Sequence, residues 1–257
     1  MSGDQAERTG SASRDDGVRA RNRRQRERAY LDAAMAIAVA DGLDALTMAR
    51  LAGDVHAAVG SVYTYFPSKG ALVAELQREA VERLTASYHL VRDRSEERLV
   101  GWDDPRDVAL ARVAVFGAFW VAAGETHPQE AALLHGLVSV ARVYVPPEER
   151  HRVLPASLAL LSEAGAAVVG ASESGAIRAL DDPAGAVVRW AAALTGVLLT
   201  ENLAQIPDYP FEPRALAREL LHELLLGWGA DPERVERVEA HLGRLEAAGP
   251  LAPRREP

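Results

Sequence analysis

One segment constrains the fold of this chain more than any other: residues 46–69, which read LTMARLAGDVHAAVGSVYTYFPSK. Its apolar side chains recur at helical spacing. Leu51 and Val55 are four residues apart, as are Val62 and Phe66, so each pair lies on one face of a helix. The segment therefore predicts two short helices joined by a tight turn. Such a pair can lay its second helix in the major groove of DNA.

Capping residues set the limits of both short helices. Thr47 precedes the first helix, where its side chain can accept hydrogen bonds from free backbone N–H groups. Pro67 ends the second helix, and Ser68 is the expected cap of a third helix.

The charge of the chain is unevenly distributed. The 257 residues carry a formal net charge of −8, but residues 1–70 hold 10 Lys and Arg against 9 Asp and Glu, a net of +1, which leaves −9 for the rest. Residues 18–29 contain one acid and six arginines: Arg19, Arg21, Arg23, Arg24, Arg26 and Arg28. A basic arm before such a motif is typical of DNA-binding proteins, and a solvated tail is the alternative.

Turn residues divide the chain into helices. We expect residues 1–20 to be a disordered basic arm, because they offer little to bury. A first helix should run from about 21 to 40 and stop at Asp41-Gly42, and another should run from about 70 to 94. Further helices are expected at 106–124, 128–143, 147–172, 183–205, 213–228 and 232–247.

Three of these helices begin with the same device, an aspartate cap followed by proline, at Asp104-Pro105, Asp182-Pro183 and Asp231-Pro232. No segment predicts a strand, so the expected fold class is all-α. The expected domains after the arm are a helix–turn–helix domain, a larger helical domain and a C-terminal tail, at 21–70, 71–247 and 248–257.

From Tyr30 to Leu72 the sequence resembles the DNA-binding domain of the tetracycline-repressor (TetR) family of transcriptional regulators. That family's pattern is an alanine-rich helix, a glycine, Leu-Thr, the helix–turn–helix and Tyr-x-(His or Tyr)-Phe-x-x-Lys. The matching elements here are Ala33-Ala34, Gly42, Leu46-Thr47 and Tyr63 to Lys69. The resemblance implies a three-helix DNA-binding domain, and a C-terminal helical domain that binds a small molecule and forms a homodimer.

The chain departs from the family at the turn. His56 replaces the usual glycine, Ala57 the usual apolar residue and Ala58 the usual serine cap. Histidine adopts left-handed backbone at a cost, and a lost serine cap costs ~1 kcal/mol. An alternative function is therefore a helical ligand-binding or scaffold protein that has lost specific DNA binding.

The resemblance also implies roles for single residues. Those at positions that contact phosphates are Thr47, Tyr63, Tyr65 and Lys69, and their hydroxyl and ammonium groups suit phosphate oxygens. Those at positions that face base edges are Val59, Gly60, Ser61 and Thr64. Arg50 could reach either the DNA backbone or a base edge. For the two tyrosines, packing within the domain is the alternative.

In the larger domain, the helices near 183–205 and 213–228 are apolar enough to pair with their copies in a homodimer. The resemblance implies an effector site, and the candidates for it are Arg112, Phe116, Phe119, Trp120, His135 and Trp190. Apolar groups with a few polar ones are typical of such sites, but each aromatic residue can equally well fill a core.

Nothing in the sequence indicates catalysis. The chain has no cysteine, and its seven histidines lack zinc-binding spacing. It also lacks the motifs of nucleophilic serine and of phosphate-binding loops. We therefore expect a regulator that is not an enzyme and has no metal or cofactor. No apolar run reaches the ~18 residues of a membrane span, so the expected location is the cytoplasm.

Overall fold

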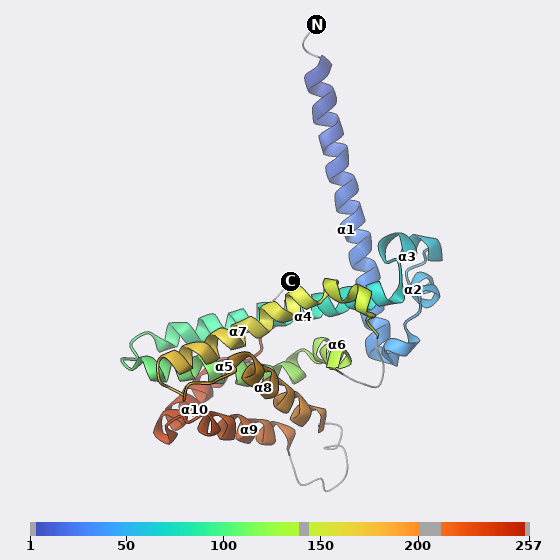
Figure 1. Ribbon diagram of the computed structural model, residues 1–257. Helices are drawn as coiled ribbons and strands as arrows, with labels where there is room; N and C mark the ends of the chain where they lie inside the picture. Colours follow the sequence, from blue (N-terminus) through green and yellow to red (C-terminus); the bar gives the residue numbers. More distant parts are fainter. Residues whose placement is uncertain (1–3, 139–143, 201–211, 255–257) are drawn as a thin grey trace. The chain divides into compact units, whose positions relative to one another are not determined.

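The computed structural model describes the backbone of residues 4–138, 144–200 and 212–254, and their side chains except those of 4–16, 135–138 and Arg214 (Figure 1). These ranges contain helices and no strand, which confirms the all-α prediction. The α-helices are α1 (Asp4–Ala45), α2 (Met48–Asp54), α3 (Val59–Tyr65), α4 (Lys69–Leu99), α5 (Pro105–Thr126), α6 (Pro128–Val138), α7 (Leu154–Glu173), α8 (Pro183–Leu198), α9 (Pro213–Gly227) and α10 (Pro232–Ala247), and a 3-10 helix, η1, spans Pro147–Arg152.

The chain divides into two compact units. The first, called the head, comprises residues 1–76 and 142–152, and the second, called the body, comprises 77–141 and 153–257. The boundary thus lies within α4, whereas the sequence predicted it after residue 70. Leu72 and Leu76 account for the difference, because both are fully buried and neither belongs to the hydrophobic cluster of the body.

Helix α1 of the head is longer than predicted. It begins at Asp4, so the segment 1–20, predicted as a disordered arm, is helical from residue 4 onward. A helix already formed adds one hydrogen bond for each residue it gains, and arginine, alanine and glutamine favour that extension. The predicted stop is confirmed: Gly42 has φ +82° and breaks the helix, a conformation that glycine adopts without strain.

The core of the head forms where α1, α2 and α3 meet. Leu46, Leu51 and Val62 are fully buried there. The Tyr30 ring meets that of Phe66 edge-on, with centroids 6.5 Å apart. Ser68 caps α4 as predicted, since its Oγ accepts from the Ala71 N–H at 3.0 Å.

Helix α5 is the centre of the body and packs against α7, α8, α9 and α10. The three predicted aspartate caps are confirmed. Asp104 accepts from the Arg106 N–H at 2.9 Å, Asp182 from that of Gly185 at 2.8 Å, and Asp231 from that of Arg234 at 3.2 Å.

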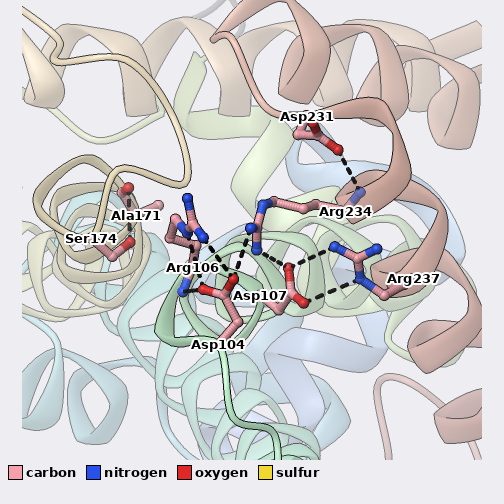
Figure 2. Close-up of polar contacts among 8 residues, drawn as sticks. All are labelled: Asp104, Arg106, Asp107, Ala171, Ser174, Asp231, Arg234 and Arg237. Carbon is pink, nitrogen blue, oxygen red and sulfur yellow. Dashed lines mark hydrogen bonds and ion pairs between the residues drawn. The ribbon is translucent and has the colours of Figure 1, made fainter.

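Charged side chains join the start of α5 to the start of α10 (Figure 2). Arg234 Nη2 donates to Asp104 Oδ2 at 2.7 Å, and its other terminal nitrogen pairs with Asp107. Arg237 Nε donates to Asp107 Oδ2 at 3.1 Å. Hydrogen bonds from Arg106 and then Arg234 hold the pKa of Asp104 well below its ordinary value. Sequence spacing cannot reveal this network, because its partners are about 130 residues apart.

Two further predictions differ from the structure. The helix predicted over 147–172 is divided into η1 and α7, because Pro155 can start a helix but cannot continue one. The predicted tail over 248–257 packs on the body as far as it is described. Leu251 and Ala252 are buried in its cluster, and Arg254 Nε donates to the Thr126 carbonyl at 2.6 Å.

Sequence analysis also underestimated the length of the apolar stretches in two helices. Within the described residues, α5 and α7 are long and apolar enough to cross a membrane by length and composition alone. In α5, 67% of the apolar window is buried, as expected of a core helix, but in α7 only 28% is buried. Helix α7 therefore exposes an apolar surface that the body does not cover.

Candidate nucleic-acid interface

The turn between α2 and α3 keeps its geometry without the usual glycine. His56 has φ +52°, the left-handed conformation predicted to carry a cost. Its N–H donates to the Gly53 carbonyl at 3.1 Å, and the Ala57 N–H donates to the Ala52 carbonyl at 2.8 Å. These two bonds form a Schellman motif, in which His56 occupies the position that glycine usually holds.

Helix α2 has a side-chain cap and α3 has none. Thr47 Oγ1 accepts from the Arg50 N–H at 3.1 Å, so the predicted cap is confirmed. Its hydroxyl hydrogen can still be donated to a phosphate oxygen. Ala58 offers no side-chain cap to α3. The first N–H groups of α3 thus have no side-chain partner from Ala58.

The outward face of α3 is made of small side chains and one tyrosine. Val59, Gly60, Tyr63 and Thr64 are exposed, and Ser61 is half-buried. Thr64 Oγ1 donates to the Gly60 carbonyl at 3.1 Å, so toward a base edge it offers a methyl group and acceptor lone pairs. The opposite face holds Val62, which is fully buried as predicted.

The structure separates the two tyrosines for which packing was the alternative. Tyr63 is 49% exposed and points away from the core of the head. The ring of Tyr65 is half-buried and meets that of Tyr30 edge-on, with centroids 5.2 Å apart. Arg23 lies over the Tyr65 ring, with Cζ 5.6 Å from its centroid. Tyr65 thus has a packing role, and sequence analysis missed its contact with Arg23.

The two cations predicted to reach DNA both contact the end of α1. Lys69 Nζ donates to the Leu43 carbonyl at 2.6 Å, and the Asp44 carbonyl lies 3.4 Å away. Arg50 forms an ion pair with Asp41. Both cations therefore fix the chain on either side of the Gly42 kink. Motif spacing shows only that Lys69 follows α3 and gives no sign of these carbonyl partners.

Four of the predicted effector residues gather in one aromatic cluster in the body. The Phe116 centroid lies 5.6 Å from that of Trp190 and 6.1 Å from those of Phe119 and Trp120. Tyr88, missed in the sequence, lies 4.9 Å from Phe116, and burial raises the pKa of its hydroxyl to about 12. Most of the ring contacts among the described aromatic residues of the body lie in this cluster.

Polar groups at this cluster are few. Trp120 Nε1 donates to Thr195 Oγ1 at 3.2 Å. Trp190 is buried, and its Nε1 has no acceptor among the described residues. A buried donor of this kind costs about 1–3 kcal/mol, and a ligand acceptor would relieve that cost.

Of the other two predicted effector residues, Arg112 is not brought to the cluster. Arg112 forms two hydrogen bonds of 2.8 Å with Glu96 on α4, and these bonds lower the pKa of that carboxyl group. Both side chains are exposed, so Arg112 serves as an ion-pair partner between α5 and α4. The side chain of His135 lies outside the described residues.

The helices predicted to form the dimer differ in their outward faces. Val188 on α8 is 57% exposed, and Leu199, which caps the end of that helix, is 54% exposed. In α9, by contrast, Leu221 and Leu225 are buried, while the outward positions include charged residues such as Arg218, Glu219 and Glu223. The apolar surface next to α8 comes instead from α7, whose Leu158 is 60% exposed. Residues 201–205 of the predicted interface lie outside the described residues.

Comparisons with known proteins agree with this geometry. Residues 31–76 match the family model for bacterial regulatory proteins of the tetR family. The fold is similar to that of the transcriptional regulator FadR from Bacillus subtilis, solved in complex with stearoyl-CoA, at 16% identity over 77% of this chain and 97% of that chain, with a TM-score of 0.53. It is also similar to a TetR/AcrR regulator from Thermobifida fusca YX-ER1, at 15% identity over 79% and 98%, with a TM-score of 0.50. No curated protein sequence matches.

Proposed function

We propose that the chain is a regulator of the TetR family, whose family model matches residues 31–76, and that it represses transcription from a palindromic DNA operator and leaves it when a small molecule binds. The observation that carries the proposal is the outward face of α3. Its side chains are exposed although the opposite face is buried, and the preceding turn holds α3 in place without the family's glycine.

The residues on this face divide into two roles. Val59, Ser61 and Thr64 are small enough to let α3 enter the major groove, where thymine methyl groups and base-edge donors can meet them. Tyr63 and Thr47 can donate hydroxyl hydrogens to phosphates beside the groove. Lys69 and Arg50 support the head through their contacts with the end of α1.

A palindrome requires two heads about one DNA turn apart, roughly 34–36 Å. We propose that a second copy of the chain supplies the other head and that the dimer forms through the outward faces of α7 and α8. Leu158 on α7 and Val188 on α8 would then be buried against the partner. Apolar area of this kind drives association, because its removal from water is favourable.

We place the effector at the aromatic cluster of the body. Phe116, Trp120 and Trp190 supply apolar contact, and the N–H of Trp190 supplies a hydrogen bond. Such a site suits an apolar molecule with a hydrogen-bond acceptor. The similar regulator FadR was solved with stearoyl-CoA, a molecule that combines an apolar chain with acceptors.

Release from DNA follows if the effector binds the off-DNA state better than the DNA-bound state. The coupling is reciprocal, so operator DNA must weaken effector binding by the same factor. Helix α4 begins in the head and continues in the body, and it is therefore the continuous element through which this coupling can pass. We expect the protein to act in the cytoplasm, where its DNA lies.

A gel shift with the DNA upstream of the protein's own gene, at low and at higher salt, tests the proposal. A shift that weakens steeply as salt rises is expected, because each neutralised phosphate releases counterions. The absence of a shift at low salt would overturn the proposal and favour a ligand-binding or scaffold protein. A charge-matched duplex of unrelated sequence controls for non-specific binding.

A further inference from the structure

We propose that α1 carries a second DNA-contacting surface, formed by Arg19, Arg23 and Arg26, which binds phosphates outside the segment that α3 reads. This inference rests on the proposed function and adds a surface to it. Helix α1 extends well beyond α2 and α3 (Figure 1), and the residues from 17 to 26 are all exposed. That length of helix contributes no buried side chain, so packing does not explain its composition.

The six arginines of residues 18–29 form two stripes on opposite faces of α1. Arg19, Arg23 and Arg26 are four and three residues apart, so they lie on one face, called the inner stripe. The other three arginines, Arg21, Arg24 and Arg28, have the same spacing on the opposite face, called the outer stripe.

Two contacts identify which stripe faces the side of α3. Tyr30 continues the inner stripe, four residues after Arg26, and its ring packs on those of Tyr65 and Phe66 at the end of α3. Arg23 itself lies over the Tyr65 ring. The inner stripe is therefore continuous with the face of the head that includes α3.

The outer stripe lies on the other side of α1. Arg28 Nε lies 3.1 Å from Asp32 Oδ1 on the same helix. Like the rest of the stripe, it lies on the side of α1 opposite Tyr30. The two stripes thus have equal charge and equal length but differ in the side of the head to which they point.

The dimensions of the inner stripe suit a DNA backbone. Its three arginines span seven residues, or about 10 Å at 1.5 Å per residue. One DNA strand carries a phosphate for each ~3.4 Å of helix axis, so such a stripe can meet two or three phosphates. Guanidinium groups suit this contact because their forked donors match phosphate oxygens. Double-stranded DNA is the occupant that its positive charge and its continuity with α3 favour.

The salt dependence of DNA binding tests the inference. The full-length chain first selects its preferred duplex from random-sequence DNA, and binding to that duplex is then measured from 50 to 200 mM salt. One variant carries Arg19→Gln, Arg23→Gln and Arg26→Gln, and the matched control carries Arg21→Gln, Arg24→Gln and Arg28→Gln. For each head that binds, the inner-stripe variant should lower the slope of log K against log salt by about 2 to 3, at ~0.9 per lost phosphate contact. The control should lower it by less than about 1 for each head.

The length of the duplex gives a second measurement. Adding six base pairs to each end should tighten binding by the wild-type chain about tenfold or more and should leave the inner-stripe variant almost unchanged. Circular dichroism should show that both variants keep the helix content of the wild type. An inner-stripe variant that has lost helix would be replaced by Arg19→Gln with Arg26→Gln, which keeps the Arg23 contact with Tyr65.

The outcomes separate this inference from the proposed function. If the wild-type chain selects DNA and the two stripes have equal effects on the slope, the inference is wrong and the proposed function stands. If the flanking base pairs have no effect on wild-type binding, the inference is also wrong. If the chain selects no DNA at all, the proposed function is wrong and this inference falls with it.

Discussion

Tyr63 in the head and the aromatic cluster in the body have opposite environments. Tyr63 on α3 is half exposed, whereas Phe119 and Trp190 in the body have almost no exposed surface. Burial does not explain the position of Tyr63, and DNA contact is the role that we propose for it. In the body, burial is sufficient to explain these aromatic side chains. The same residue class thus points to function in the head and is ambiguous in the body.

The largest expected effect is the loss of a buried tryptophan. Trp190→Ala should lower the free energy of unfolding by about 3–5 kcal/mol, because it leaves a cavity among Phe116 and Trp228. Chemical denaturation followed by tryptophan fluorescence measures it, and all four tryptophans lie in the body. Val59→Ala on the exposed face of α3 is the control and should change that free energy by less than about 0.5 kcal/mol. Equal losses of unfolding free energy for the two variants would contradict the distinction between the buried cluster of the body and the exposed face of α3.

Next in size is the loss of the Lys69 ammonium. Lys69→Ala should destabilise the head by about 1.5–3 kcal/mol, because the carbonyls of Leu43 and Asp44 lose a charged donor. Hydrogen exchange of the amides in α1 and α2 reports on the head directly. DNA binding should weaken about equally for all sequences, with the same salt slope. A slope that falls by about 0.9 would show instead that Lys69 neutralises a phosphate.

A smaller effect is expected at the turn. His56→Gly should stabilise the head by up to about 1 kcal/mol, since glycine adopts the left-handed conformation without steric cost. The same hydrogen-exchange measurement applies, with Gly53→Ala, in an ordinary helical conformation, as the comparison. If His56→Gly destabilises the head, the imidazole makes a contact that outweighs its backbone strain.

The smallest effect concerns acid and the body. The pKa of Asp104 is lowered in the folded state, so this carboxylate stabilises the body above the unfolded pKa, near 3.9, and that contribution disappears as pH falls through the folded value. In the Asp104→Asn variant, the body should therefore be less stable at neutral pH, and its stability should depend less on pH below 4. Thermal unfolding followed by tryptophan fluorescence tests this. Identical pH profiles for the variant and the wild type would contradict the role of the Arg106 and Arg234 contacts.

Local patterns predicted the parts of the fold that depend on neighbouring residues. Helix spacing, the Thr47 cap and the aspartate caps are set within a few positions, so each could be read from the sequence and is present in the structure. The partners of Lys69, Arg112 and Arg234 could not be predicted from the sequence, because they lie 16 to about 130 residues away in the chain. Motif matching assigned Lys69 by its position after α3, and only the folded chain places it against α1.

The body shows the same limit for apolar residues. Composition indicated that α8 and α9 are both apolar, but not which side each one turns outward. The structure buries Leu221 of α9 and exposes Leu158 of α7, because the packing of α5 against its neighbours determines which faces remain open. Composition therefore indicated which helices are apolar, and only the structure shows which of their faces are exposed.

The central claim is that the outward face of α3 reads DNA sequence. Its most direct test measures the affinity of the wild-type chain and of Thr64→Ala for the selected duplex and for every single-base-pair variant of one half-site. Tyr63→Phe is the control, because the loss of its phosphate contact should weaken binding to all duplexes equally. Thr64→Ala should relax discrimination at one or two positions by about 1–3 kcal/mol, or roughly 5- to 150-fold, and leave the other positions unchanged. A uniform loss at every position for Thr64→Ala would contradict the claim.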